Sequence, residues 1–315
     1  MGKCMYLVIP CYNEEEVLYE TSNRLLAKLN EMIEDGLVNT TSRIMFVNDG
    51  SKDNTWNIIE QLNKKSKYFI GVKLTRNKGH QNALLAGLME AKNRCDFAIS
   101  LDADLQDDIE VLSDFVKEYE KGNDVVYGVR SSRDKDSFFK KNTAVLFYRL
   151  MTKLGVEIVY NHADYRLMSK RALEDLSTFK EVNLFLRGIV PLIGYNNSIV
   201  MYERNERFAG ESKYPLKRML SFAINGITSF SVKPIRIITF LGMIMFAISS
   251  ILTIYFALGK IIYGNTNSGW ASLICSIWLL GGIQLLSIGI VGEYVGKIYL
   301  ESKHRPLYFI EKFLE

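Results

Sequence analysis

Paired cysteines are lacking from this chain. Its 315 residues include four cysteines, Cys4, Cys11, Cys95 and Cys275, at spacings that match neither a disulfide framework nor a zinc site. This absence excludes the small disulfide-stapled folds and the zinc-binding modules. It predicts reduced thiols that face the cytosol.

A strong charge of either sign is also lacking. Lysine and arginine number 39 against 35 for aspartate and glutamate, which gives a formal net charge of +4 and a pI of about 8.7. This excess is too small to indicate nucleic-acid binding, but it suits a protein that lies against anionic lipid or handles phosphates. The apolar run that follows Lys3 is too short for a signal peptide, and we expect a buried strand there.

Charged residues are absent from two long stretches, 237–258 and 271–291. Each stretch can cross a hydrocarbon core of ~30 Å as a helix; a pair of buried helices in a soluble core is the alternative. Basic residues precede the first stretch and follow the second, whereas the connection at 260–270 is nearly uncharged. The positive-inside rule therefore predicts a cell-membrane protein with two spans and with both termini in the cytoplasm.

Two further segments, 138–154 and 215–233, combine apolar residues at helical spacing with basic residues. We interpret 215–233 as an amphipathic helix in the membrane surface, with a core helix of the soluble part as the alternative. The predicted organisation is a soluble domain at 1–214, the interfacial helix at 215–233, a transmembrane hairpin at 234–295 and a cytoplasmic tail at 296–315.

The first 130 residues alternate short apolar runs with amphipathic windows. We expect strands at 6–9, 44–47, 69–74, 97–101 and 125–127, and helices at about 14–34, 53–65, 79–92 and 107–121. This alternation predicts an α/β domain with a mostly parallel sheet and helices on both faces. Ligands bind at the carboxyl ends of the strands in such sheets, so the polar residues there are the candidates for chemistry.

Polar clusters follow three of the expected strands, at 10–14, 48–51 and 102–107. Asp102 and Asp104 can place one carboxylate on a divalent cation and the other on a ribose or a bridging water. Taken alone, such a pair is more often a solvated turn or a helix cap, and the same holds for Asp49 and Asp53 in the second cluster.

The combination of blocks is more specific than any one of them. The blocks are Val8-Ile-Pro-Cys-Tyr-Asn-Glu-Glu15, Val47-Asn-Asp-Gly-Ser-Lys-Asp-Asn-Thr55, Arg76-Asn-Lys-Gly-His-Gln-Asn-Ala83, Leu101-Asp-Ala-Asp-Leu-Gln-Asp107, Tyr127-Gly-Val-Arg130, Ala163-Asp-Tyr-Arg-Leu-Met-Ser169, Arg207-Phe-Ala-Gly-Glu-Ser-Lys-Tyr214 and Gly292-Glu-Tyr-Val-Gly-Lys-Ile-Tyr299. In this order they resemble the large inverting glycosyltransferase family with the GT-A fold. They are most similar to its polyprenyl-phosphate glycosyltransferases, the group that includes dolichol-phosphate mannose synthase and the bacterial undecaprenyl-phosphate glucosyltransferases.

The resemblance covers nearly the whole chain and implies a GT-A fold for 1–214. It also implies roles for single residues. Nucleotide-sugar binding is implied for Pro10, Tyr12, Glu14, Asp49, Lys78, Asp102, Ser212, Lys213 and Tyr214. Asp104 and Gln106 are implied as ligands of Mg²⁺ or Mn²⁺. Arg130, Arg133 and Lys141 are implied to bind the acceptor phosphate. Catalytic roles are implied for Asp102, Asp104, Asp164 and Arg207, the last on a loop that similar enzymes close over the donor diphosphate.

The implied acceptor shapes the expected mechanism. A phosphate is already ionised at pH 7, so it needs no strong general base. We expect direct displacement with inversion, driven by positioning and by stabilisation of the leaving nucleotide through the metal and the basic loop. Asp164 and Arg166 are interpreted as a pair that shapes the sugar pocket or orients the acceptor. For His162 we expect a polar loop role rather than metal binding.

Several alternatives stay open. Glucose from a UDP donor is the first choice of sugar, beside N-acetylglucosamine, mannose, galactose and aminoarabinose, and undecaprenyl phosphate is preferred over dolichyl phosphate. Another membrane transferase, acting on a different lipid or on a polysaccharide, is disfavoured because a Gln-x-x-Arg-Trp block is lacking. A non-catalytic sugar-binding scaffold is the third possibility. Expected partners are membrane lipid, a second copy of the chain through the glycines of 281–292, and a downstream flippase and transferase for surface glycan modification.

Overall fold

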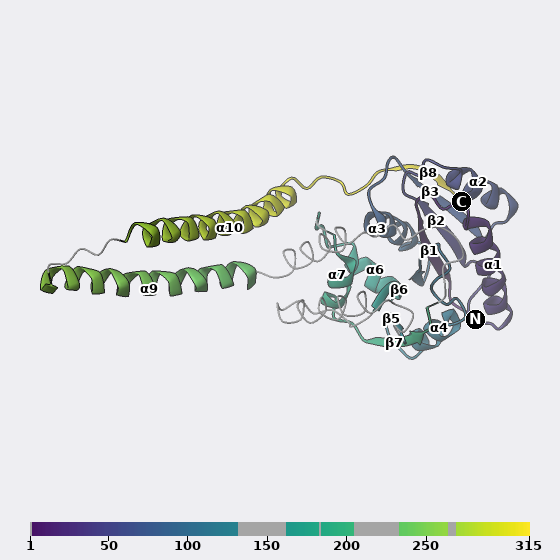
Figure 1. The fold of residues 1–315 in the computed structure, drawn as a ribbon. Coiled ribbons are helices and arrows are strands. Elements are labelled where there is room, and N and C mark those ends of the chain that lie inside the picture. The colour runs from purple at the N-terminus through teal and green to yellow at the C-terminus, as the bar shows by residue number, and fades with distance from the viewer. Residues whose placement is uncertain (1, 132–161, 183, 205–232, 264–268) are drawn as a thin grey trace.

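The computed structural model describes residues 2–131, 162–182, 184–204, 233–263 and 269–315, and its centre is one eight-stranded sheet (Figure 1). The strands are β1 (Met5–Cys11), β2 (Arg43–Asn48), β3 (Phe69–Leu74), β4 (Phe97–Ser100), β5 (Val125–Arg130), β6 (His162–Ser169), β7 (Asn197–Tyr202) and β8 (Ile310–Leu314). The helices are α1 (Leu18–Glu34), α2 (Thr55–Lys65), α3 (His80–Ala91), α4 (Leu112–Glu120), α6 (Lys170–Leu176), α7 (Leu186–Leu192), α9 (Lys233–Tyr263) and α10 (Trp270–Ser302).

The sheet has the order β7-β5-β6-β4-β1-β2-β3-β8. Strands β3, β2, β1 and β4 pair in parallel, and so do β5 and β7, whereas β6 runs antiparallel between β4 and β5. All five strands expected in the first 130 residues are present, and the mostly parallel α/β sheet is confirmed. The carboxyl ends of β1, β2, β3, β4, β5 and β7 therefore meet at one edge, which we call the carboxyl edge.

Helices cover both faces of the sheet, as expected. Alternate residues of β1 point to opposite faces: Leu7 and Ile9 join a core with α1, α2 and α4, whereas Tyr6 and Val8 join a core with α3, α6 and α7. Residues of α1 at helical spacing, such as Leu25 and Leu29, are fully buried in the first core. The domain is therefore a three-layer sandwich with the sheet in the middle.

Helix α3 packs unusually close to the sheet. Gly87 has no side chain, and a Cβ atom there would lie 2.4 Å from Val8 Cγ1 and 2.6 Å from Val47 Cγ2. Real Cβ atoms do not approach that closely, so glycine at this position allows the contact. The close packing places the start of α3 directly at the carboxyl edge.

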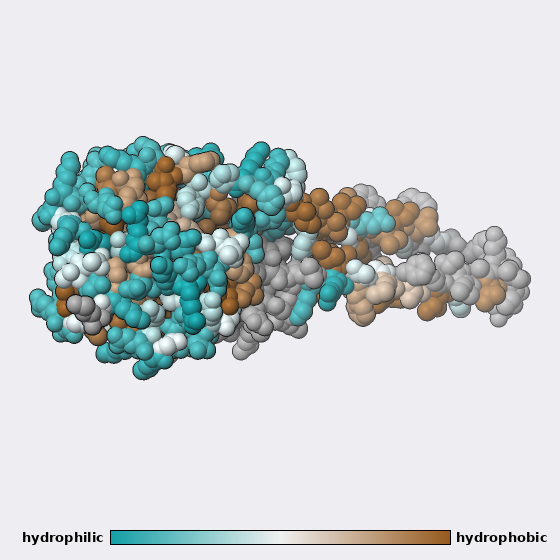
Figure 2. Space-filling model, turned by 180° about the vertical axis from the view of Figure 1, so that it is seen from behind, coloured by the Kyte–Doolittle hydropathy of each residue, from teal (hydrophilic) through white to brown (hydrophobic). Residues whose placement is uncertain are grey.

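The helices α9 and α10 run side by side and extend away from the sheet (Figure 1). Their large apolar side chains, among them Phe240, Ile251 and Leu285, are exposed, and they form a brown surface in Figure 2. Among the described residues, one stretch, Leu280–Ser302, is long and apolar enough to cross a membrane. Both predicted apolar segments are helical, but a pair of transmembrane helices is not confirmed. The segments 138–154 and 215–232 lie outside the described residues.

The C-terminal residues extend the sheet instead of forming a separate tail. Strand β8 pairs antiparallel with β3, with Leu314 opposite Gly71 and Phe313 opposite Val72. Leu314 packs against the core on one face of the sheet and Phe313 against the core on the other. The predicted boundary at 296 therefore changes: α10 continues to Ser302 and residues 310–314 belong to the α/β domain.

Replacing Leu314 with alanine should lower the free energy of unfolding of the domain by about 2 kcal/mol, because it removes apolar atoms from the core and leaves a space beside Gly71. Thermal or urea unfolding followed by circular dichroism would measure the change. The matched control is Glu311→Ala on the same strand, whose exposed side chain forms an ion pair with Lys73; its loss should cost less than about 1 kcal/mol. Equal effects of the two substitutions would contradict a structural role for β8.

Candidate active site

The loops that follow β1 and β2 bind each other at the carboxyl edge. The backbone N–H of Asn13 donates to Ser51 Oγ at 3.0 Å, and Asn13 Oδ1 accepts from the N–H of Lys52 at 2.9 Å. The N–H of Glu14 donates to Thr55 Oγ1 at 2.9 Å. These bonds hold the loop that carries Tyr12 and Glu14 in one position relative to β2, and both side chains are partly exposed there.

Asp49 is buried and binds the loop between β3 and α3. Its Oδ1 accepts from the N–H of Lys78 at 2.7 Å, and its Oδ2 accepts from the N–H of Gly79 at 2.9 Å. Burial raises the pKa of Asp49, although these two bonds and the nearby His80 and Lys78 oppose the rise. The predicted donor-binding residues Asp49 and Lys78 are thus adjacent, next to buried Pro10 at the end of β1.

The residues after β4 form a tight turn. Asp104 Oδ1 accepts from the backbone N–H of Gln106 at 3.2 Å, and Leu105 between them has a positive φ of 57°. The side-chain oxygen of Gln106 accepts a hydrogen bond from the Arg204 guanidinium. Asp102 and Asp104 remain partly exposed at the carboxyl edge, beside the loops of β1 and β2.

Asp164, near the start of β6, lies at the centre of a charged cluster. Its Oδ1 accepts from Arg166 Nη2 at 2.7 Å, and its two oxygens accept from Nε and Nη2 of Arg187 at 3.2 and 3.1 Å. His80 Nε2 lies 3.5 Å from Asp164 Oδ2 and 3.6 Å from Asp102 Oδ1. Burial opposes ionisation, but Arg187, His80 and Arg166 hold the pKa of Asp164 well below its usual range.

His80 was not among the predicted site residues, although it lies inside the block at 76–83. It is the first residue of α3, and the close packing of that helix brings it between Asp102 and Asp164. Burial lowers the pKa of His80, but the two carboxylates outweigh this effect and raise the pKa to about 9. The imidazole therefore carries a positive charge at neutral pH.

Asp107 and Tyr202 were also missed. The hydroxyl of Tyr202, at the end of β7, donates to Asp107 Oδ1 at 2.6 Å, and Arg130 Nε donates to the same hydroxyl at 3.3 Å. Burial and the charge of Asp102 raise the pKa of Asp107 to about 6. Arg130, predicted to bind the acceptor phosphate, is thus held at the carboxyl edge by a residue that only the fold brings near.

The predicted metal site can be tested against its donor atoms. No cluster of three metal-binding side chains occurs in the described part of the chain. Mg²⁺ bound together with substrate phosphates needs only one or two protein carboxylates, and Asp104 with Asp102 supplies these. Burial raises the pKa of Asp102, and so do the carboxylates of Asp104 and Asp164, although His80 opposes the rise. A cation shared with a diphosphate would relieve this repulsion, so the residues fit such a site.

Some predicted residues cannot be placed. Six of them lie outside the described residues: Arg133, Lys141, Arg207, Ser212, Lys213 and Tyr214. The structure brings together the others, Pro10, Tyr12, Glu14, Asp49, Lys78, Asp102, Asp104, Gln106, Arg130 and Asp164, at the carboxyl edge.

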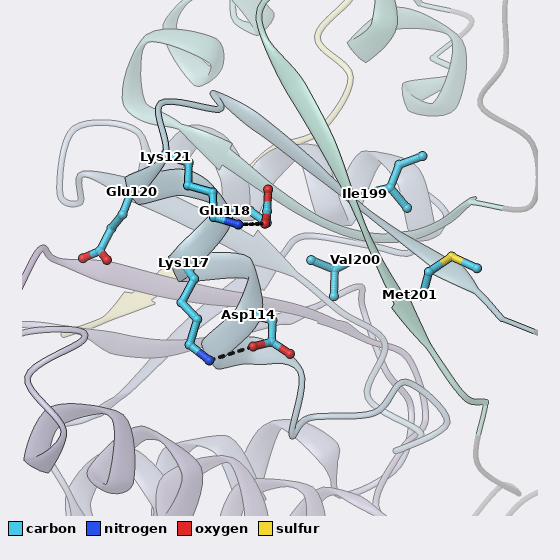
Figure 3. A pocket seen from close by; sticks show the side chains of 8 residues that line it. All are labelled: Asp114, Lys117, Glu118, Glu120, Lys121, Ile199, Val200 and Met201. Carbon is cyan, nitrogen blue, oxygen red and sulfur yellow. Dashed lines mark hydrogen bonds and ion pairs between the residues drawn. The ribbon is translucent and has the colours of Figure 1, made fainter.

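A surface groove between α4 and β7 is separate from this site (Figure 3). Four of its charged side chains form pairs along α4 and its C-terminal cap, where Lys117 binds Asp114 at 2.9 Å and Lys121 binds Glu118 at 2.5 Å. The contribution of β7 is apolar, through Ile199, Val200 and Met201. The groove shares no residue with the cluster around Asp164 and offers no converging groups for chemistry.

Comparisons with known proteins identify the family of the chain. Residues 6–177 match the family model of glycosyl transferase family 2. The chain is 57% identical over 305 residues to the uncharacterized glycosyltransferase YkoT of Bacillus subtilis (strain 168), covering 97% of this chain and 90% of that protein. It is 40% identical over 309 residues to the bactoprenol glucosyl transferase of Shigella phage SfV, covering 97% of each. It is 39% identical over 310 residues to the prophage bactoprenol glucosyl transferase homolog of Escherichia coli (strain K12), covering 97% and 98%.

The mostly parallel sheet with carboxylates at its carboxyl edge defines an α/β enzyme of the GT-A type. The chain belongs to glycosyl transferase family 2 and is a glycosyltransferase.

The charge of His80 should make stability depend on pH. Because the pKa of His80 in the folded protein is about 9, above its ordinary value of 6.5, its charge stabilises the fold fully below about pH 6.5. This contribution disappears as the pH rises through about 9. The difference in unfolding free energy between the natural protein and His80→Gln should therefore shrink between these pH values. The exposed His304 supplies the control, His304→Gln, and a difference that stays constant with pH would contradict the assignment.

Proposed function

We propose that this chain transfers glucose from UDP-glucose to undecaprenyl phosphate at the cytoplasmic face of a membrane. The observation that supports this proposal most is the convergence of Asp49, Asp102, Asp104 and Asp164 at the carboxyl edge, where α/β enzymes bind nucleotides. The relatives named as bactoprenol glucosyl transferases support the sugar and the acceptor.

The proposed donor site lies between the loops of β1 and β2 and the turn after β4. Pro10, Tyr12 and Glu14 would contact the base, and Lys78 the ribose or the base, beside the loop that Asp49 holds. Asp102 would contact the ribose and the diphosphate. Asp104, with Gln106, would hold Mg²⁺ or Mn²⁺, which when bound neutralises charge that develops on the leaving diphosphate. Arg207, Ser212, Lys213 and Tyr214, which lie outside the described residues, are proposed by resemblance to bind the donor diphosphate.

The proposed acceptor determines the mechanism. An oxygen of the prenyl phosphate attacks the anomeric carbon, the bond from that carbon to the diphosphate breaks, and the electron pair leaves with UDP. The phosphate is ionised at neutral pH, so no side chain has to remove a proton. A mechanism without a general base agrees with the state of Asp164. Burial raises the pKa of this carboxyl, but the neighbouring cations outweigh burial and hold the pKa well below its usual range, so that Asp164 is a poor proton acceptor. We therefore assign Asp164 an electrostatic and positioning role.

The proposed location is a membrane, with the α/β domain on its cytoplasmic side. The stretch Leu280–Ser302 supports one crossing helix, and the uncharged stretch at 237–258 supports a second. The connection at 260–270 would then lie outside the cell and both ends of the chain inside.

This topology predicts the reactivity of introduced cysteines in intact cells. A membrane-impermeant maleimide should label Asn267→Cys and should label Lys303→Cys only after the cells are permeabilised. Protein in which the native cysteines have been replaced provides the background. Labelling of both positions, or of neither, before permeabilisation would contradict a two-span hairpin.

Transfer can be tested with purified protein in detergent, undecaprenyl phosphate, Mg²⁺ or Mn²⁺ and a panel of UDP- and GDP-sugars. We expect one donor, UDP-glucose, to give a lipid-linked product by mass spectrometry, and Asp104→Ala to lower turnover by about 100-fold or more. Asp114→Ala, an exposed carboxylate on α4 that binds Lys117, is the matched control. Nucleotide release without a lipid product would indicate another lipid or a polysaccharide acceptor. Absence of turnover with every donor would favour a sugar-binding scaffold.

A further inference from the structure

Arg187 is a charged residue of the site that no sequence block contains. It is the second residue of the short helix α7, and its side chain is 28% exposed at the carboxyl edge. Nε and Nη2 form a two-point contact with the carboxylate of Asp164, at 3.2 and 3.1 Å. Such a paired contact fixes the plane of the guanidinium as well as its position.

Asp164 has more positive neighbours than it needs for neutrality. Arg166, which also donates to the carbonyl of Leu186 at 3.2 Å, is fully buried beside it, and His80 lies on its other side. One buried Arg–carboxylate pair would already be neutral, so Arg187 leaves Asp164 and its two arginines with a positive charge, while His80 also faces the carboxylate of Asp102. A bare carboxylate here would repel an incoming phosphate, whereas this cluster attracts one.

Arg187 also lies near Arg130, the arginine that the resemblance assigns to the acceptor: Val129, just before Arg130, pairs with His162 at the start of β6, and Arg187 binds Asp164 on that same strand. Burial and the Arg187 guanidinium lower the pKa of Arg130, while Tyr202 and Asp107 raise it by more. Two guanidinium groups that repel each other in a partly enclosed site gain stability when an anion lies between them. Arg130 comes from β5 and Arg187 from α7, so the pair faces the site from two elements.

The position of α7 relates this pair to the membrane-directed helices. Helix α7 lies on the side of the α/β domain from which α9 and α10 extend (Figure 1). Glu301, near the end of α10, accepts two hydrogen bonds from the backbone N–H of Val182, at 2.9 and 2.8 Å, in the segment that leads into α7. A lipid held along these helices would present its headgroup to the α7 side of the site.

We infer that Arg187, oriented by Asp164, binds the phosphate of the prenyl-phosphate acceptor together with Arg130. This assignment rests on the proposed function and deepens it. Arg187 contributes hydrogen bonds to the phosphate oxygens that do not attack, and the attacking oxygen keeps its electron pair for the anomeric carbon. Asp164 then acts through Arg187 as a positioning residue.

The test compares Arg187→Ala with the natural protein in the transfer of glucose from UDP-glucose to farnesyl phosphate, a short acceptor that dissolves in water. Charge-assisted bonds of this kind correspond to a 10- to 100-fold effect, so the acceptor KM should rise by about that factor. The KM for UDP-glucose and the affinity for UDP should stay within about twofold. Arg187→Lys, which keeps the charge but loses the planar fork, should fall between the two proteins.

Arg171→Ala is the matched control, because Arg171 forms an ion pair with Asp124 at the opposite edge of the sheet. It should leave both KM values unchanged. A rise in the donor KM alone, or a fall in kcat with both KM values unchanged, would overturn the assignment of Arg187. If Arg187→Ala does not fold, an unchanged acceptor KM in Arg187→Lys overturns it equally. Natural protein that transfers glucose to no prenyl phosphate would instead refute the proposed function, and the assignment with it.

Discussion

The buried carboxylate of Asp164 holds the site together. It contacts two arginines and lies 3.5 Å from His80, so that one side chain connects β6, α7 and the start of α3. Removing charges from water costs several kcal/mol per ion, and the cost is offset only when each charge has a close partner of opposite sign. The cluster therefore contributes to the positions of α7 and α3 relative to the sheet, and it determines which cations lie at the carboxyl edge.

A second buried carboxylate, Asp49, also holds the start of α3. Asp49 binds the backbone of Lys78 and Gly79, the two residues before α3, while Gly87 allows the helix to contact β1 and β2 closely. The start of α3 is thus held by Asp49 through the backbone of Lys78 and Gly79 and by Asp164 through His80. Asp102 and Asp104 are partly exposed at the same edge, and Asp102 lies 3.6 Å from His80 at the start of α3.

The C-terminal part of the chain connects the α/β domain to the apolar helices. Glu301 bonds to the segment before α7, and β8 then pairs with β3 at the far edge of the sheet. The apolar surfaces of α9 and α10 have no place in the core of the α/β domain, and exposed apolar area of this extent favours a lipid environment. The C-terminal part of the chain therefore contacts the α/β domain at two places, through Glu301 at Val182 and through β8 at β3. The first contact gives the end of α10 a defined position relative to α7.

Local patterns in the sequence determined the first half of the fold. The strands from β1 to β5 and the helices from α1 to α4 follow from apolar periodicity, because each is a contiguous segment whose buried face is visible in its own residues. The carboxylates at the ends of β2 and β4 were found for the same reason, since parallel strands bring their carboxyl ends to one edge. The blocks around Asp104 and Asp164 further indicated the enzyme class.

Only the tertiary structure decided which distant residues meet. Strand β8 is a short segment beyond a long apolar helix, and nothing in its own pattern shows that it pairs with β3. Tyr202 and Arg187 carry no local signal, because a tyrosine at a strand end or an arginine on a helix is commonplace until its neighbours are known. His80 stands inside the block at 76–83, but the block does not show which carboxylates it meets. The roles of all three residues arise from ionic and hydrogen-bond contacts across 22 to 95 positions of sequence, and such contacts depend on the distance in space, which the folded chain alone establishes.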